Sequence, residues 1–223
     1  MTLQSRSILD KDLNELKANI LQITSLVDTA IEQAMLALDQ RDVALAQKVI
    51  NNDHQVNQLR YDIEEAGLRI LATQQPMAGD LRVVIAAIHL AVELERIGDH
   101  AAGIARLVAR LESEEEIDSL HKLPKMARRA RQMLKESIDA FANKDVVAAK
   151  AMIGRDDKID RQYNKLFQET LEEMQDDAYI RRATFLLWVG HNLERIGDRA
   201  TNIAERVIFM TTGEFVETST AMN

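Results

Sequence analysis

The sequence predicts an all-α protein built as two tandem, pseudo-repeated three-helix bundles with six long helices. Three observations support this prediction. The 223 residues include only 8 glycines and 2 prolines, too few for the many turns of an all-β or alternating α/β chain. Good helix formers, namely Ala, Leu, Glu, Gln and Arg, dominate the composition. Apolar residues also recur at helical spacing, and the whole pattern occurs twice.

The spacing of apolar residues predicts the first three helices. Over residues 13–37 they are alternately three and four apart, which is the seam of a helix that packs against others. A second helix follows after a short turn, because Asp42 is a suitable cap and apolar residues then recur every seven positions over residues 49–70. Pro76 ends this helix and opens a third, whose seam covers residues 81–105. Such short connections require antiparallel neighbours.

The second half of the chain repeats the first. Asp42-Val43 matches Asp145-Val146 at an offset of 103 residues. Leu-Glu-Arg-Ile-Gly-Asp occurs at residues 94–99 and again at 193–198, an offset of 99. The sixth helix, with its seam over residues 180–208, is therefore the counterpart of the third. The predicted organisation is a first bundle at 1–111, an acidic linker at 112–119, a second bundle at 120–212 and a tail at 213–223.

Composition excludes several classes of protein. Without cysteine the chain has no disulfides, thiolate zinc sites, cysteine nucleophiles or iron–sulfur ligands. It has neither a signal-peptide pattern nor an apolar run long enough for a bilayer, so we expect no transmembrane segment and a cytoplasmic location. A net charge of −8 argues against nucleic-acid binding. Nucleotide-cradling loops and nucleophile elbows are missing, so we expect no enzyme.

The repeated motif places acids on helix seams. Glu95 and Asp99 are four apart and share one helix face, as do Glu194 and Asp198. An ionised glutamate at such a position costs on the order of several kcal/mol to desolvate, unless it is paired with a cation or binds a metal. Two like charges on one face repel each other, and a bound cation would remove the repulsion. The glycine between them leaves room for a neighbouring helix.

Further polar pairs occur on the helix expected to face each motif. Asp53 and Asn57 are four apart in the first repeat, and Asp156 and Asp160 are four apart in the second. Oxygen ligands of this kind suit Mg²⁺, Mn²⁺, Ca²⁺ or iron. The alternative is that the acids pair with Arg or Lys of adjacent helices. The candidate metal ligands are Asp53, Asn57, Glu95, Asp99, Asp156, Asp160, Glu194 and Asp198.

Histidines and a basic run are weaker candidates for function. We expect His89 and His191 to lie near helix seams as core residues, and His54, His100 and His121 to be exposed. Six cations occur between Lys122 and Lys135. They form either a solvated helix face or a docking patch for an acidic partner or a membrane surface.

These motifs closely resemble the PhoU family of phosphate-uptake regulators. The resemblance covers residues 8–212 and rests on the two Leu-Glu-Arg-Ile-Gly-Asp copies, together with Gln75-Pro76 and Asp80-Leu81-Arg82. It implies a cytoplasmic, non-enzymatic adaptor that restrains phosphate-starvation signalling by linking a phosphate-specific ABC transporter ATPase to a sensor histidine kinase. It also implies a homodimer, and metal ions (Mg, Mn, Fe or Zn) at the acidic motifs. A metal-dependent phosphatase-like enzyme and a purely structural helical adaptor are the alternatives.

Overall fold

The computed structural model describes residues 3–112, 114, 120–154 and 157–216, and within them it contains helices and no strand. The all-α prediction is confirmed. The helices are α1 (Leu3–Gln40), α2 (Val43–Gln74), α3 (Gly79–Leu111), α4 (Leu123–Asn143), α5 (Val146–Ile153), α6 (Asp157–Glu173), the short 3₁₀ helix η1 (Asp177–Tyr179) and α7 (Ile180–Thr212).

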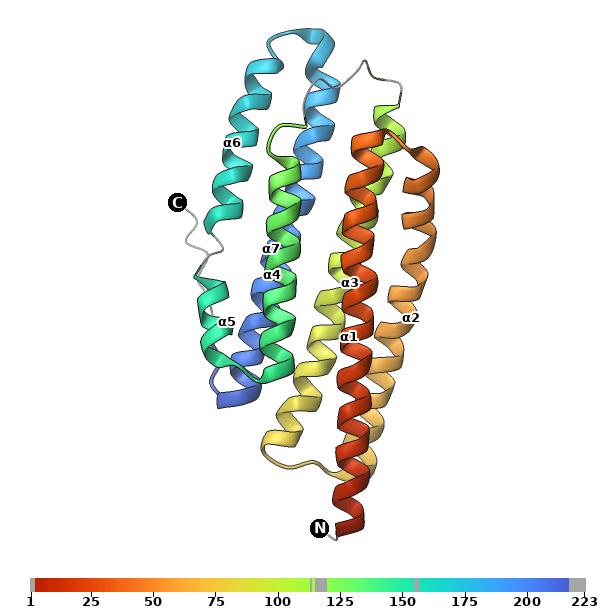
Figure 1. Cartoon of the computed structure of the whole chain (residues 1–223), viewed down its shortest axis with the longest axis vertical. Coiled ribbons are helices and arrows are strands. Elements are labelled where there is room, and N and C mark those ends of the chain that lie inside the picture. Colours follow the sequence, from red (N-terminus) through yellow and green to blue (C-terminus); the bar gives the residue numbers. More distant parts are fainter. Residues whose placement is uncertain (1–2, 113, 115–119, 155–156, 217–223) are drawn as a thin grey trace.

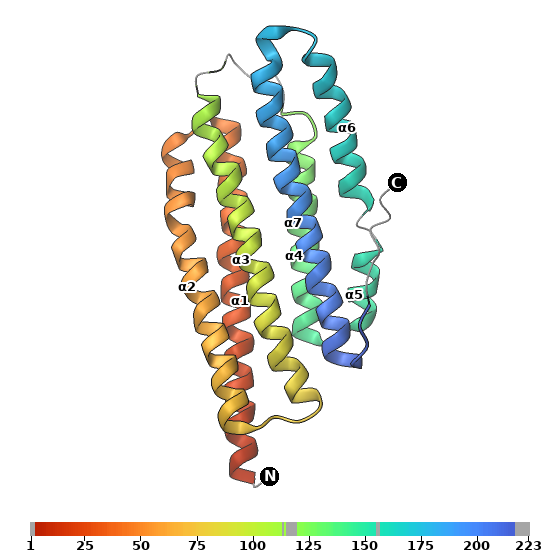
Figure 2. The same cartoon turned by 180° about the vertical axis from the view of Figure 1, so that it is seen from behind.

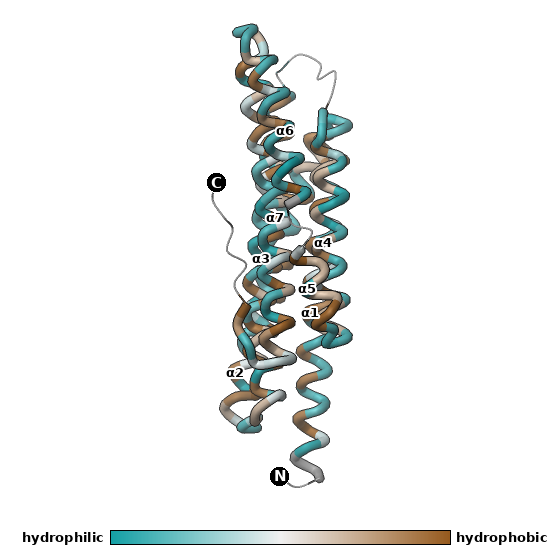
Figure 3. Tube along the Cα trace, turned by 90° about the vertical axis from the view of Figure 1, so that its left-hand side faces the viewer, coloured by the Kyte–Doolittle hydropathy of each residue, from teal (hydrophilic) through white to brown (hydrophobic). Residues whose placement is uncertain are grey.

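The helices form two bundles that lie side by side (Figure 1). The first bundle contains α1, α2 and α3, and the second contains α4, α5, α6 and α7. Viewed from behind, α3 and α7 are neighbours at the centre of the molecule, and they form its most extensive helix–helix contact (Figure 2). In the edge-on view α1 and α4 lie on one side of the molecule and α3 and α7 on the other (Figure 3).

The predicted seams form the core. Val49, Val56, Ile63 and Ile70 are all buried, as is most of the α1 seam. One cluster of buried apolar side chains includes residues of both bundles. Leu81 and Ile180, the first seam residues of α3 and α7, are wrong predictions, since they are 39% and 43% exposed. Both lie in the first turns of their helices, where fewer neighbouring helices remain to cover a side chain.

The internal repeat is visible in atomic detail. The Asp42 carboxylate accepts a hydrogen bond from the backbone N–H of Leu45 at 2.9 Å, and Asp145 accepts one from Ala148 at 2.9 Å, 103 residues later in each case. These two caps begin α2 and α5 and supply one of the helix's unsatisfied N–H groups with a partner.

The counterpart of α2 in the second repeat was predicted as one long helix, but the structure describes it as two segments, α5 and α6. Helix α5 ends at Ile153, and the backbone N–H of Gly154 donates to the carbonyl of Lys150 at 3.2 Å, which closes the last turn. Residues 155–156 lie outside the described residues, and α6 begins at Asp157. The second repeat therefore has two shorter helices where the first has the continuous α2.

Candidate metal centre

The first acidic cluster lies where α2 meets α3. Glu95 and Asp99 belong to α3, and Asp53 and Asn57 belong to α2. A methyl group at Gly98 would lie 3.4 Å from Asp53 Oδ1 and 3.2 Å from Val56 Cγ1, so α2 approaches α3 closely at this glycine. The expectation that glycine admits a facing carboxylate is therefore confirmed in this repeat.

The four side chains of the first cluster are partly shielded from water. The Glu95 side chain is only 13% exposed, whereas Asp99 is 41% exposed at the edge. Asn57 donates from Nδ2 to Asp53 Oδ2 at 3.2 Å, which leaves the Asn57 side-chain oxygen as a further acceptor. The cluster thus presents oxygen atoms from two adjacent helices.

Negative charge in this cluster is not fully balanced. Burial raises the pKa of Asp53, and the charge of Asp99 raises it further. Burial also raises the pKa of Glu95, with Asp99 again the second cause. Arg106 acts in the opposite direction on Asp53 without cancelling the rise. A raised carboxyl pKa means that the ionised form is disfavoured, and a cation would relieve this.

Arg96 offsets part of that negative charge, because its guanidinium contacts both α3 acids of the cluster. Its Nε lies 3.5 Å from Glu95 Oε2, and its Nη1 donates to Asp99 Oδ2 at 3.2 Å. The Arg96 side chain is 55% exposed and forms no bidentate pair with either acid. An exposed single contact of this kind contributes about 0–1 kcal/mol, too little to offset a buried carboxylate.

The second cluster repeats the first with different neighbours. Arg195 donates to Asp198 Oδ2 at 3.1 Å, as Arg96 does to Asp99. His191 Nδ1 lies 3.2 Å from Glu194 Oε2, and burial is the main cause that raises the pKa of Asp198. Asp160 is partly buried on α6, but Asp156 lies outside the described residues.

The glycine of the second motif has the equivalent surroundings. A methyl group at Gly197 would lie 3.2 Å from Ile159, which corresponds to Val56 at the offset of 103. The neighbour of the glutamate has changed, however. The pKa of Tyr163 is raised, first by burial and second by the nearby charge of Glu194. In the first repeat the equivalent position is Arg60, whose charge acts on Glu95. The two clusters are related but not identical.

The side-chain oxygens of the two clusters are the type of ligand that a hard metal cation prefers. Among the described residues no group of three or more His, Asp or Glu side chains is arranged to hold a metal ion as it stands. Carboxylate and amide oxygens at a helix contact, with two disfavoured charges, nevertheless suit Mg²⁺, Mn²⁺ or iron. A bound cation would supply positive charge that balances the acids and links the two helices. The residues that would hold it are Asp53, Asn57, Glu95 and Asp99 in the first cluster, and Asp160, Glu194 and Asp198 in the second.

Most expectations for the histidines are wrong. His89 and His191 are exposed, whereas His100 is half-buried and its Nδ1 lies 3.1 Å from Asn192 Oδ1 of α7. The His121 side chain is 17% exposed, with Nε2 2.9 Å from Glu173 Oε1. These contacts join segments far apart in the sequence, so helical spacing alone contains no signal for them.

Two adjacent helical bundles, α1–α3 and α4–α7, carry the same acidic motif at equivalent positions and define a tandem-repeat helical protein. The PhoU domain matches residues 20–108 and again residues 123–207. The chain therefore belongs to the PhoU family, as the sequence motifs predicted.

Relatives with similar sequences are named for phosphate transport. The phosphate-specific transport system accessory protein PhoU homolog of Clostridium acetobutylicum is 34% identical over 215 residues, covering 96% of this chain and 98% of the relative. The homolog of Streptococcus pneumoniae serotype 4 is 35% identical over 95% of this chain and 99% of its own length. These names describe accessory proteins and no enzyme, in agreement with the expectation from the sequence.

Solved structures show the same fold. The crystal structure of the phosphate transport system regulatory protein PhoU from Streptococcus pneumoniae superposes with a TM-score of 0.88 at 35% identity, covering 94% of this chain and 99% of that one. PhoU from Pseudomonas aeruginosa gives a TM-score of 0.86 at 35% identity, covering 92% of this chain and 99% of that one.

Within the described residues, every helix is too short or too polar to cross a membrane.

Proposed function

We propose that this protein is a cytoplasmic, metal-binding adaptor that regulates phosphate uptake. It acts between a phosphate-specific ABC transporter ATPase and a sensor histidine kinase, and it restrains phosphate-starvation signalling as a homodimer. Membership of the PhoU family and the names of the relatives, which are accessory and regulatory proteins of phosphate transport, support the regulatory part of this proposal.

The observation that carries the metal-binding part is the unbalanced charge of the first cluster. Asp53, Glu95 and Asp99 meet at a close helix contact, and Arg96 is the one cation that contacts two of them among the interactions described. A protein whose acids had only a structural role would be more stable with fewer charges here. Retaining them in both repeats is reasonable if a cation binds them.

Metal binding is tested with Glu95→Gln/Asp99→Asn, which preserves shape and removes two charges. In chelator the melting temperature of this variant should exceed that of the parent, because the repulsion with Asp53 is relieved. With excess Mn²⁺ or Mg²⁺ the order should reverse. A site present only in the folded state stabilises it by about 2.7 kcal/mol when free metal is 100 times the dissociation constant.

The control for this test is Asp62→Asn/Glu65→Gln, which removes two exposed acids elsewhere on α2. Its metal-dependent shift should equal that of the parent. A parent protein whose melting temperature does not respond to metal, and which contains none by elemental analysis, would leave pairing with arginine as the role of the motif.

The adaptor role is tested in cells and by co-purification. Deleting the gene should switch on a phosphate-starvation reporter in phosphate-rich medium, and restoring the parent chain should switch it off. The tagged protein should retain the transporter ATPase and the sensor kinase on the same column. A reporter that stays repressed after deletion would contradict negative regulation.

A further inference from the structure

A groove runs between α1 and α4, the two helices that cross the front of the molecule in Figure 1. It comprises two cavities of about 550 Å³ and 280 Å³. Both are lined by Arg128 and Arg131, so they adjoin at these two arginines and form one continuous groove. From Pro124 to Asp139 the α4 wall spans 16 residues, and the 15 steps between them cover about 23 Å at 1.5 Å each.

The lining of the groove is largely apolar. On the α1 side Leu21 and Leu36 are 42% and 43% exposed, an unusual degree for leucines in a helix whose other face is core. On the α4 side Leu134 and Ile138 close the larger cavity, and Pro124 lines the smaller one. Exposed leucines at both ends of a groove are a feature of sites that receive another apolar surface.

The middle of the groove is positively charged. Arg131 binds two of the three acids of the α1 wall, with Nε 2.7 Å from Asp28 Oδ1 and Nη1 2.8 Å from Glu32 Oε1. That pairing leaves the cations Arg128 and Lys135, neither of which has an ion-pair partner within the described part of the chain.

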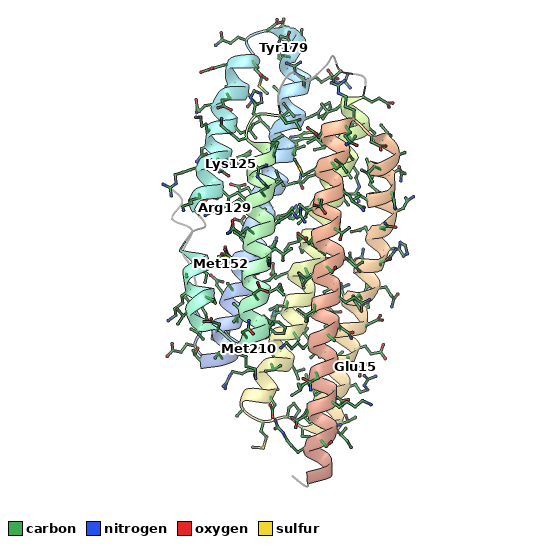
Figure 4. The ribbon with its side chains drawn as sticks, in the orientation of Figure 1. Glu15, Lys125, Arg129, Met152, Tyr179 and Met210 are labelled. Atoms are coloured by element: carbon green, nitrogen blue, oxygen red, sulfur yellow. The ribbon has the colours of Figure 1, made fainter. Side chains whose placement is uncertain are left out.

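Other charges near the groove lie at its ends or outside it. Asp39 lines the end near Pro124, and Asp139 lines the opposite end. Lys125 and Arg129 do not belong to the lining, and Figure 4 shows both on the side of α4 that faces α6. The basic run of α4 is thus divided, with Arg128, Arg131 and Lys135 directed toward the groove.

We propose that this groove binds an amphipathic helix of a partner protein, about four turns long, with acidic residues at the middle of the edge that faces α4. The proposal rests on the adaptor function and specifies how one partner is held. The apolar stripe of the helix would cover Leu21 and Leu36, and its acids would pair with Arg128 and Lys135. Recognition of this kind places an apolar helix face in an apolar groove and adds charge pairs for orientation.

The groove fits a helix better than a membrane surface. Its apolar lining is recessed between two helices, whereas a helix bound at a membrane surface buries its apolar face about 5–10 Å into the headgroup and acyl boundary. Asp39 and Asp139 at the two ends would repel anionic headgroups. Asp28 and Glu32 of the α1 wall are paired with Arg131, which offsets their charge toward an acidic partner helix.

The test uses the full-length protein and fluorescein-labelled 16-residue peptides. One peptide has a leucine stripe with two glutamates seven residues apart, the spacing of Arg128 and Lys135, and the other has lysines in place of these glutamates. The Glu peptide should bind in an anisotropy titration. The Arg128→Glu/Lys135→Glu variant should bind it at least tenfold more weakly, and should bind the Lys peptide more tightly than the parent does.

The matched control is Lys158→Glu/Lys165→Glu, two exposed cations of α6 with the same spacing of seven. It should leave binding of the Glu peptide unchanged. Hydrogen exchange should show protection on α1 and α4 in the complex.

Equal affinity for both peptides, no saturable binding, or protection confined to other helices would overturn the proposal. The proposal would also be overturned if the parent bound phosphatidylglycerol vesicles but not the Glu peptide, and the groove variant lost the vesicle binding. That result would assign the groove to a membrane. None of these titrations needs metal or a phosphate signal, so their failure would leave the reporter and melting tests of the proposed function unaffected.

Discussion

Individual glycines set how closely the helices approach each other. At Gly190 of α7 an added methyl group would lie 2.5 Å from Leu166 Cδ2 and 3.2 Å from the Tyr163 ring. At Gly79, the first residue of α3, nothing lies within 4 Å of that position. The same substitution therefore has different consequences at the two sites.

Gly190→Ala should destabilise the protein by about 1 kcal/mol. Overpacking costs about 1–3 kcal/mol, and the better helix propensity of alanine offsets about 1 kcal/mol of it. Gly79→Ala should change the free energy of unfolding by less than about 0.5 kcal/mol. Urea unfolding measures both, and equal free energies of unfolding for the two variants would contradict the close packing of α6 on α7.

His89 predicts a small dependence of stability on pH. Although the residue is exposed overall, partial desolvation of its ring and, second, the charge of Arg206 lower its pKa below the ordinary value, while Glu93 acts in the opposite direction. The unfolded chain therefore takes up a proton at this histidine before the folded protein does, and stability falls as the pH falls from about 7 toward the lowered pKa. In His89→Gln the loss of stability between pH 7.5 and pH 5.5 should be smaller. An unchanged pH dependence of the urea midpoint would contradict it.

At the scale of elements, apolar spacing was sufficient to predict the helices of the first bundle. The seams of α1 and α2 are buried because a heptad pattern needs only one continuous partner surface. The interruption after α5 was not predictable, since Gly154 lies in an otherwise helical pattern and a lone glycine is often tolerated there. Whether a helix continues past such a residue depends on the packing around it.

The candidate site was predictable in part for a similar reason. The position of Glu95 and the close approach at Gly98 follow from seam position and helical geometry. The contact of Arg96 with Asp99 does not, because a long side chain can reach three residues along its own helix although its Cα–Cβ bond points elsewhere. Contacts between bundles, such as Arg131 with Asp28, require an arrangement that the sequence pattern does not specify.

Arg131 joins α4 to α1 and should contribute to stability through the geometry of its guanidinium. It donates from Nε and Nη2 to both oxygens of Asp28, at 2.7 and 2.8 Å. Arg131→Lys keeps the charge but loses this bidentate pair, so it should cost about 1 kcal/mol. Arg128→Ala, which removes a cation without a partner from the same wall, should cost less than about 0.5 kcal/mol. Equal urea midpoints for the two variants would show that the bidentate pair contributes nothing.

At the scale of the whole molecule, α3 and α7 are antiparallel, and an arginine near the start of each helix contacts the end of the other. Arg82, near the start of α3, donates from Nε to the carbonyl of Met210 at the end of α7 at 3.2 Å. Its counterpart at the offset of 99, Arg181, contacts Glu114 just beyond the end of α3 at 3.3 Å. Together with the shared apolar core, these contacts indicate that the two bundles fold as one unit.

Gly103 gives a direct test of this coupling, because it lies on the face of α3 that packs against α7. A methyl group there would lie 3.0 Å from Asn192 Oδ1 of α7. Leucine at this position should push α7 away and break the contact between Asn192 and His100, whereas leucine at Gly79 meets open space. Gly103→Leu should therefore weaken the coupling between the bundles far more than Gly79→Leu.

The single tryptophan, Trp188, lies in α7 and reports on the second bundle, whereas far-ultraviolet circular dichroism reports on all the helices. In the parent protein the urea transitions seen by the two probes should coincide, as expected for a cooperative unit. In Gly103→Leu they should separate, because each bundle would then unfold at its own midpoint. Gly79→Leu should retain coincident transitions. Transitions that differ already in the parent would mean that the α3–α7 contact does not couple the bundles. Transitions that still coincide in Gly103→Leu would mean that the contacts of Arg82 and Arg181, together with the α1–α4 contact, couple the bundles without close α3–α7 packing at Gly103.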